Sequence, residues 1–594
     1  MKKHTLLPFV AGLFLLLAPV ACQDKFFEKN PPGTASATQI GTRQGADLLL
    51  TSAYSVLDGV GSNTDGGIDP VWFGTGTNRV YGDLPSDDAH KGSGAGDQPN
   101  QGAFELYSVQ PNNDYIDPKW SALYDGANRT NAVLKAVKAA TDMDDASMKR
   151  ITGEARFLRG HYHFDLKRVF NNVPYIDENV VDPRVSNTDA SGNFVNIWPQ
   201  IEADFQYAVA NLLETQSQVG RANKSAAKAY LAKVFMYQNK IAEARALLTD
   251  VIATGQTSDG KKYGLTENFY DNFNAATKNS RESVFAIQFS VNDGAVNAGN
   301  GNWGDILTYP QFTGLCCGFY RPTQNLVNAY KTDTNGLPLL NTFNDSDVNN
   351  DGDANPNKTF TPYTGPLDPR LDWTVGRLGI PYLDWGIHPG YFASNGSEHS
   401  GPYSSIKQVF RKSQQGVLST SSGGAPMANA NNYTIIRFAD VLLMAAEAEV
   451  EVGSLEQARA YVNLIRKRAK MGSVVMTQVN PNDPSKGFTK TPAANYVVNE
   501  YAAPWADKAV ARQAVRFERR LELAMEGHRF FDLVRWGVVD QVIGIYLTAE
   551  KMKRPFLSAA RFVKGKSEYQ PLPEVQIINS AINGKATLKQ NPGY

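Results

Sequence analysis

Cysteine and histidine are scarce in this sequence of 594 residues. Its three cysteines, Cys22, Cys316 and Cys317, give no disulfide framework of the kind found in small secreted domains. A chain of this length can stabilise its core by burial alone. We expect the adjacent Cys316 and Cys317 to be free, partly buried thiols, because a disulfide between neighbours forces an unfavourable peptide geometry. The seven histidines form no cluster with metal-ligand spacing, which argues against zinc catalysis.

Recognisable catalytic motifs are also missing. The sequence has no glycine-rich phosphate loop, no GxSxG turn, no HExxH and no CxxC. Carboxylate pairs such as Asp87 and Asp88 are compatible with a glycosidase, but spacing in sequence does not set their separation in space. We therefore expect a binding protein and not an enzyme, with a surface glycoside hydrolase or other hydrolase as the alternative.

Net charge is absent, because 59 basic residues balance 59 acidic ones. A protein with no net charge has no general electrostatic attraction for nucleic acid or for an anionic surface. We therefore expect no nucleic-acid partner. After the N-terminus, no apolar run is long enough for a transmembrane helix. We therefore expect a soluble body, joined to a membrane only through its N-terminus.

The start of the chain has the pattern of a bacterial lipoprotein signal. A short basic segment is followed by an apolar run over residues 6–20, and the sequence turns polar directly after Cys22. Pro19 departs from the pattern, since such signals usually carry Leu at that position. We predict a signal peptide over residues 1–21 and a lipid anchor on Cys22, with simple secretion as the alternative. Two or more acyl chains give stable anchoring.

Apolar residues recur at three- and four-residue spacing near both ends of the chain, which predicts an all-α fold. The expected helices cover residues 46–56, 127–140, 148–170, 198–212 and 225–253. The last range contains the spacing of a tetratricopeptide repeat, at Leu231, Ala232, Phe235, Ala244 and Leu248. A weaker copy lies between residues 442 and 465, with Gly453 in the turn. Helix pairs of this kind stack into a superhelix.

Two segments lack this periodicity and are rich in Gly, Asn, Ser and Pro. They cover residues 59–110 and 279–432. Long irregular segments within a compact protein are usually functional, so we place recognition there. Sugar rings stack on exposed aromatic side chains, while polar side chains form hydrogen bonds with the hydroxyl groups. The candidate glycan-stacking residues are Trp72, Tyr81, Trp303, Tyr320 and Trp385.

The segment 515–536, VRFERRLELAMEGHRFFDLVRW, begins as a helix and then gathers charges of both signs around a glycine and two aromatics. Because buried charges must be paired, we interpret it as a semi-buried ion-pair lattice that braces helices. The expected members are Glu518, Arg519, Glu526, Arg529, Asp532 and Arg535. The alternative is an enzyme site in which Glu526, His528 and Asp532 act as acid and base.

One loop carries the first half of a calcium-binding pattern. Asp347, Asn349 and Asp351 alternate as in a D-x-N-x-D-G loop, and Asp353 continues the alternation. Lys358 stands where such a loop usually has a bidentate Glu, so a solvated Asn/Asp-rich loop is the alternative. A structural calcium at these four residues is a hypothesis, and no other cofactor is expected.

Several segments resemble the SusD/RagB family of outer-membrane nutrient-binding lipoproteins from Bacteroidota. The segment Glu518 to Gly537 is similar to the family signature ERRLELAFEGHRFFDLRRWG, and the final five residues, QNPGY, match the usual ending. Residues 153–164 and 437–448 are similar to two further family segments. The matches run from residue 22 to residue 594, which is nearly the whole mature chain.

This resemblance implies a tetratricopeptide-like superhelix that bears an irregular, loop-rich lobe. It divides the mature chain into a helical region, 22–278, and a C-terminal region, 279–594, with the irregular lobe at 279–432 and helices at 433–594. It also implies a lipid-anchored protein on the outer surface of the outer membrane. Such a protein captures oligosaccharides and delivers them to a SusC-like TonB-dependent transporter. Capture of peptides or glycopeptides, which the family also allows, is a further hypothesis.

Overall fold

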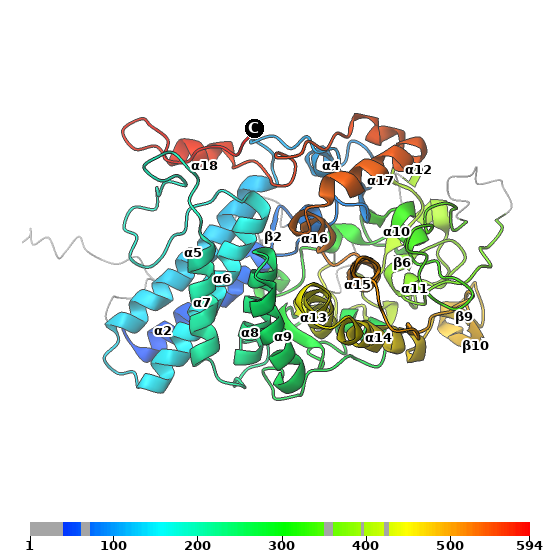
Figure 1. Cartoon of the computed structure of the whole chain (residues 1–594), viewed down its shortest axis with the longest axis horizontal. Helices are drawn as coiled ribbons and strands as arrows, with labels where there is room; N and C mark the ends of the chain where they lie inside the picture. Colours follow the sequence, from blue (N-terminus) through cyan, green and yellow to red (C-terminus); the bar gives the residue numbers. More distant parts are fainter. Residues whose placement is uncertain (1–39, 61–71, 350–359, 394–396, 421–426) are drawn as a thin grey trace, which may run out of the picture.

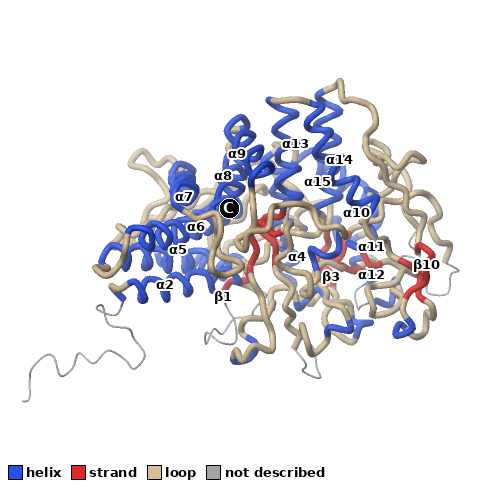
Figure 2. The backbone as a smooth tube through the Cα atoms, turned by 90° about the horizontal axis from the view of Figure 1, so that it is seen from below, coloured by secondary structure: helices blue, strands red, loops and turns tan. Residues whose placement is uncertain are grey.

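The computed structural model describes residues 40–60, 72–349, 360–393, 397–420 and 427–594. Helices from distant parts of the chain stand side by side, and loops with short strands gather at one end of them (Figures 1 and 2). The signal segment and Cys22 lie outside the described residues, so the predicted lipid anchor remains a prediction.

The helices form a stack in which each packs on the next, α2 on α5, then α6, α7, α8 and α9 in turn. Helix α9 packs on α13, so the stack continues across the irregular segment that separates them in sequence (Figure 1). Helix α13 then packs on both α14 and α15. The stacked helices are α2 (Arg43–Ser55), α5 (Ile116–Ala139), α6 (Asp145–Phe170), α7 (Trp198–Asn211), α8 (Lys224–Tyr237), α9 (Ile241–Thr254), α13 (Phe438–Val452), α14 (Leu455–Met471) and α15 (Lys508–Leu523).

Local sequence explains why these helices start and pack where they do. The Asp144 side chain caps α6 by accepting a hydrogen bond from the backbone N–H of Ser147 at 2.7 Å, and Asn223 caps α8 in the same way. Ala232 and Ala244 are fully buried where α8 and α9 approach closely. The predicted helical, tetratricopeptide-like fold is therefore confirmed.

Short antiparallel strands tie the irregular segments together. The strand pairs are β1 (Gly59–Val60) with β2 (Gly74–Thr75), β3 (Ala89–Gly92) with β5 (Phe319–Pro322), β4 (Ser283–Ile287) with β8 (Tyr433–Arg437), β6 (Val375–Gly376) with β7 (Ser404–Ser405), and β9 (Met476–Gln478) with β10 (Phe488–Pro492). In the β3–β5 pair, His90 stands opposite Arg321. This pair joins the two segments that the sequence marks for recognition into one loop-rich lobe.

The other α-helices of the described residues belong to the lobe and to the end of the chain. They are α3 (Arg79–Gly82), α4 (Pro99–Glu105), α10 (Gln324–Ala329), α11 (Leu371–Thr374), α12 (Ser397–Ser400), α16 (Arg529–Arg535), α17 (Val539–Lys553) and α18 (Glu574–Asn579). One buried hydrophobic cluster runs from Ala46 to Leu588 and includes both stack and lobe. The expected boundary at residue 279 does not interrupt it. Within the described ranges, no helix has the length and apolar character needed to cross a membrane.

The last residues of the chain are fixed against the end of α6. The Asn591 side chain donates hydrogen bonds to the backbone oxygens of Phe170, at 2.7 Å, and Gln570, at 2.8 Å. It also accepts a hydrogen bond from Asn172 at 2.9 Å. The motif QNPGY therefore closes the C-terminal end of a scaffold helix, and that gives the motif a structural purpose.

The predicted ion-pair lattice is present and buried. Glu522, which is fully buried, binds Arg437 at 2.5 Å, Arg370 at 2.9 Å and also Arg468. Glu526 binds Arg437 at 2.9 Å and Lys407 at 2.7 Å. We use the name "lattice" for a set of connected charges. On the α15–α16 segment they are Glu518, Arg519, Arg520, Glu522, Glu526, Arg529, Asp532 and Arg535, and their partners are Asp87, Asp88, Arg370, Lys407, Arg437, Asp440, Glu447, Arg466 and Arg468. Glu282 and Asp368 complete the lattice by binding Arg437, Arg468 and Arg370.

The lattice connects the scaffold with the lobe. Arg519 binds Asp440 of α13 at 2.5 Å, while Arg520 binds Asp88, just before β3, at 2.7 Å. Next to these pairs, the Asp83 carboxylate accepts a hydrogen bond from the backbone N–H of Gly527 at 2.7 Å. A Cβ atom on Gly82 would lie 2.0 Å from the backbone oxygen of Gly527, so the two segments touch where only glycine fits.

We predict that Glu522→Gln destabilises the protein by about 3–5 kcal/mol, because three guanidinium groups would face one neutral amide. Although burial raises the pKa of Glu522, Arg468, Arg437 and Arg370 hold it well below its usual value. The carboxylate therefore stabilises the fold at neutral pH. Denaturant unfolding measures the loss.

The matched control for this prediction is Glu456→Gln. Glu456 forms an exposed ion pair with Arg459 on α14, so its loss should leave the unfolding midpoint nearly unchanged. Equal midpoints for the two variants would contradict the assignment of the lattice as the main brace of the fold.

Candidate functional site

Three of the five predicted stacking residues are buried. Tyr81 and Tyr320 have exposed fractions of 2% and 1%, and Trp385 of 8%. Their polar atoms are used internally, since Tyr81 donates to the backbone oxygen of Tyr115 at 2.6 Å and Trp385 to that of Phe410 at 2.8 Å. The expectation that these rings are exposed is wrong. The irregular lobe folds around aromatic residues of its own, and a lack of helical periodicity does not reveal such a core.

Trp72 and Trp303 are partly exposed, and they come from segments that meet. The carbonyl of Gly304, next to Trp303, accepts a hydrogen bond from Arg79 Nε at 3.2 Å. A Cβ atom on Gly304 would lie 2.1 Å from Oγ1 of Thr75, three residues after Trp72. Trp303 is oriented by its indole N–H, which donates to the backbone oxygen of Ala298 at 3.0 Å. The ligand role of both rings stays a prediction.

The calcium hypothesis falls partly outside the described residues. Asp351 and Asp353 lie there, so their positions relative to one another are not described. Asp347 binds Lys553 at 2.6 Å, and Asn349 donates to the backbone oxygen of Thr361 at 3.2 Å. The described part of the chain contains no group of three or more His, Cys, Asp or Glu arranged to hold a metal ion. Calcium binding remains a hypothesis.

The expectation of free thiols at Cys316 and Cys317 is wrong. The structure joins their sulfur atoms in a disulfide. The peptide bond between the two residues is cis, with the Cα atoms 3.1 Å apart. We expected free thiols because a bridge between neighbours needs an unfavourable peptide geometry, and the structure contains that geometry.

The acid–base alternative finds no support at Glu526, His528 and Asp532. Burial lowers the pKa of His528 to about 3, and it is therefore neutral at ordinary pH. Burial raises the pKa of Asp532, but Arg519 and Arg535 outweigh it and lower the value to about 2. Lys407 and Arg437 likewise keep Glu526 ionised. Glu526 and Asp532 belong to the lattice, and none of the three groups lines the cleft described next.

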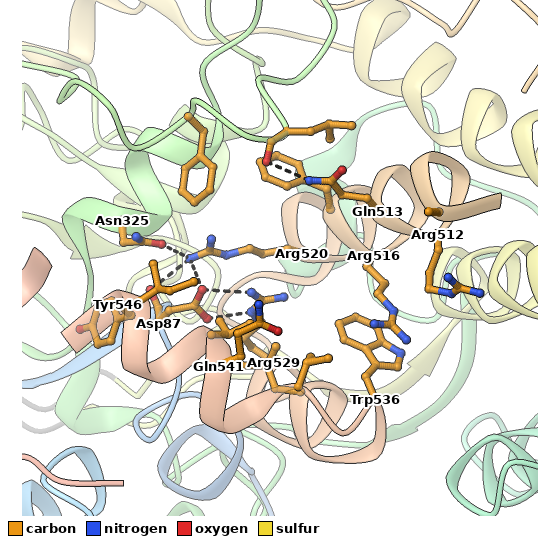
Figure 3. Close-up of a pocket in the computed structure, with 18 residues that line it drawn as sticks. Asp87, Asn325, Arg512, Gln513, Arg516, Arg520, Arg529, Trp536, Gln541 and Tyr546 are labelled. Atoms are coloured by element: carbon orange, nitrogen blue, oxygen red, sulfur yellow. Dashed lines mark hydrogen bonds and ion pairs between the residues drawn. The ribbon is translucent and has the colours of Figure 1, made fainter. Parts of the chain in front are cut away.

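A cleft of about 430 Å³ opens beside the lattice, between α15, α16, α17 and the segment around Phe343 (Figure 3). Its polar wall consists mainly of side chains from α15, with Trp536 at one end and Asp87 at the other (Figure 3). Leu340, Phe343 and Ile545 form part of an apolar wall. This mixture of apolar surface and converging polar groups is typical of a small-molecule site.

Asp87 balances the charge at its end of the cleft. Arg520 and Arg529 converge on it, with Arg529 Nε at 2.8 Å and Arg520 Nη2 at 3.1 Å (Figure 3). Burial raises the pKa of Asp87, but the two guanidinium groups outweigh it and lower the value to about 2. Arg520 also donates to Asn325 Oδ1 at 2.7 Å. These two arginines are therefore occupied by partners within the protein.

Sequence reasoning did not single out this cleft, because it favoured a structural lattice for the 515–536 segment and named only Glu526, His528 and Asp532 as an alternative site. A signal was available. Arg512, Arg516 and Arg520 follow one another at four-residue spacing, which places three guanidinium groups on one face of α15. Arg512 and Arg520 bind carboxylates from segments distant in sequence, Glu451 and Asp87. Only the structure therefore shows which of the three arginines has an acidic partner.

The stack and its lobe define a helical-repeat scaffold that presents irregular loops. Residues 281–594 match the SusD family, and residues 77–236 match a family described as starch-binding and associating with the outer membrane. The chain belongs to the SusD family. The recognition made from the signature and the final QNPGY is therefore confirmed.

Known proteins are similar to this chain over all or nearly all of its length. SusD-like protein P2 of Formosa agariphila is 24% identical, and the match covers 100% of both chains. A solved laminarin-binding SusD-like protein is 24% identical with a TM-score of 0.63, covering 93% of this chain and 100% of the other. Surface glycan-binding protein A from Bacteroides thetaiotaomicron, solved with laminarihexaose, is 19% identical with a TM-score of 0.64, covering 93% and 99%.

Proposed function

We propose that this protein is a cell-surface glycan-binding lipoprotein. It captures oligosaccharides at the outer membrane and delivers them to a SusC-like TonB-dependent transporter. Binding, and not bond cleavage, is its task. The helical stack serves as a rigid support, and the loop-rich lobe carries the recognition.

The observation that carries this proposal is the likeness of the whole chain to SusD-family proteins described as glycan-binding. Trp72 and Trp303 add local support, because both are partly exposed where the two irregular segments meet. Aromatic faces of this kind stack on the apolar C–H faces of sugar rings. The sequence contains none of the catalytic motifs sought above.

A glycan array with product analysis tests the proposal, using the chain without residues 1–22, which are the predicted signal peptide and the predicted anchor residue Cys22. We expect retention of at least one oligosaccharide that is recovered at its original length. Shortened products would favour the surface hydrolase. Displacement of the bound glycan by peptides, or retention of peptides alone, would favour the peptide-binding alternative.

We predict that Trp72→Ala or Trp303→Ala weakens binding of the retained glycan by about 2 kcal/mol or more, since few contacts carry most of an affinity. Isothermal titration measures the loss, and the melting temperature should change little because both rings are partly exposed. Trp385→Ala is the matched control, since this buried ring should cost stability instead. Unchanged binding in both Trp72 and Trp303 variants would place the ligand elsewhere.

We further predict that Cys22→Ala releases the protein from the membrane. The motivating pattern is the apolar run that ends at Cys22 and turns polar. Fractionation of cells that lack the partner transporter is the measurement, because the transporter alone can retain a protein that has lost its anchor. A variant that still sediments with the outer membrane in such cells would refute lipid anchoring at this residue.

A further inference from the structure

Arg516 differs from the other arginines that line the cleft, because those arginines bind carboxylates of the protein. No described residue forms an ion pair or hydrogen bond with its side chain, and its Nε atom is buried. Arg520 and Arg529 bind Asp87, as shown above, and Arg512 binds Glu451 at 2.5 and 2.9 Å. A buried donor without an acceptor is unfavourable by about 1–3 kcal/mol, and more for a charged group. Such a group calls for an external partner.

The nearest acidic side chains are already used. Glu447 accepts hydrogen bonds from both terminal nitrogens of Arg535, at 2.7 and 2.8 Å, and from the indole N–H of Trp536, at 2.9 Å. Glu451 is shared between Arg512 and Lys508. Neither carboxylate accepts a hydrogen bond from Arg516, and both already bind other cations. Arg516 therefore has no direct ion pair at the cleft, although Glu447 and Glu451 lie near enough to favour its charged form.

The guanidinium group of Arg516 is held in place although it lacks an acidic partner. Its central carbon lies 4.7 Å from the centroid of the Trp536 ring, a cation–π contact that orients the group (Figure 3). Burial lowers the pKa of Arg516 below its ordinary value, which reflects the lack of solvation. A planar donor that is oriented in advance suits a planar or tetrahedral anion, which it can bind through two N–H groups.

Apolar side chains also line the cleft. They are Leu340 and Phe343 from the segment after α10 and Val542 and Ile545 from α17, and Gln513 and Gln541 add amide groups to the lining. The volume of about 430 Å³ lies in the range of small-molecule sites. Together these walls suit a ring with apolar C–H surface, several hydroxyl groups and one anionic substituent.

We propose that this cleft binds a sugar unit that carries a carboxylate or a sulfate group, with the anion on Arg516 and the ring against the apolar wall. This inference rests on the proposed glycan-binding function and adds the charge of the ligand and the place of one of its units. Uronic and sulfated sugars share the required chemistry, and the experiment separates them.

The experiment compares matched sugars that differ at one carbon: galactose, galacturonate and galactose 6-sulfate, with the corresponding glucose series. Ligand-observed NMR titration against the chain without residues 1–22 gives each Kd at low salt. We expect at least one anionic sugar to bind about tenfold or more tightly than its neutral counterpart, as a charge-assisted hydrogen bond implies. The relative affinity of the carboxylate and the sulfate identifies the anion.

Two variants assign this preference to the cleft. Arg516→Gln should abolish the tenfold difference with little change in melting temperature, because Arg516 loses no ion pair or hydrogen bond, only its cation–π contact with Trp536. Gln541→Glu introduces a carboxylate of the same shape and should weaken the anionic sugars about fivefold or more while sparing neutral ones. Arg512→Gln is the matched control on the same helix face, and it should keep most of the preference because Glu451 already occupies Arg512.

Several results would overturn the inference. They are equal affinities for charged and neutral sugars, a preference that survives Arg516→Gln, and a preference that Arg512→Gln removes just as fully. Sodium sulfate that binds as tightly as galactose 6-sulfate would also overturn it, because the site would then recognise the anion and not the sugar. If these results appear while the glycan array still shows binding, the inference fails and the proposed function stands. If the array retains no glycan, the proposed function itself is rejected.

Discussion

Charge pairing around α15 and α16 is the constraint on which the rest of this structure depends. Arginines from the lobe, the β8–α13 segment and α14 converge on Glu522, while Arg520 and Arg529 reach back to Asp87 and Asp88 near β3. These charges are buried, so each is tolerated only while its partners stay in place. The lattice therefore fixes how the scaffold and the lobe meet. It gives the most recognisable segment of the sequence a structural purpose.

The residues that we propose for recognition, by contrast, take no part in the ion pairs of the lattice. Trp72 and Trp303 sit where two irregular segments meet, and Arg516 stands beside the lattice without an acidic partner. Three lattice members, Asp87, Arg520 and Arg529, line the same cleft as Arg516, and they bind one another. Loops and cleft walls can vary on such a scaffold while the paired charges remain.

Much of the fold could be predicted from the sequence, but little of the site. Helical periodicity and the spacing of Leu231, Phe235 and Leu248 are local signals, and they located the stacked pairs. The lattice followed from the rule that buried charges are paired. Burial of Tyr320 and Trp385, the disulfide at Cys316 and the unpaired state of Arg516 depend on segments distant in sequence. No local pattern reports such contacts, so exposure and charge compensation had to come from the structure.

Hydrogen–deuterium exchange of the intact chain tests the central claim most directly. If the lattice joins lobe and scaffold, the amides of β3 and β5 should exchange together with those of α15, through the same slow opening. Their opening free energies should agree within about 1 kcal/mol and fall together when the lattice charges are neutralised by acid. Rapid exchange in β3 and β5 while α15 remains protected would contradict the account, because the lobe would then open independently of the lattice.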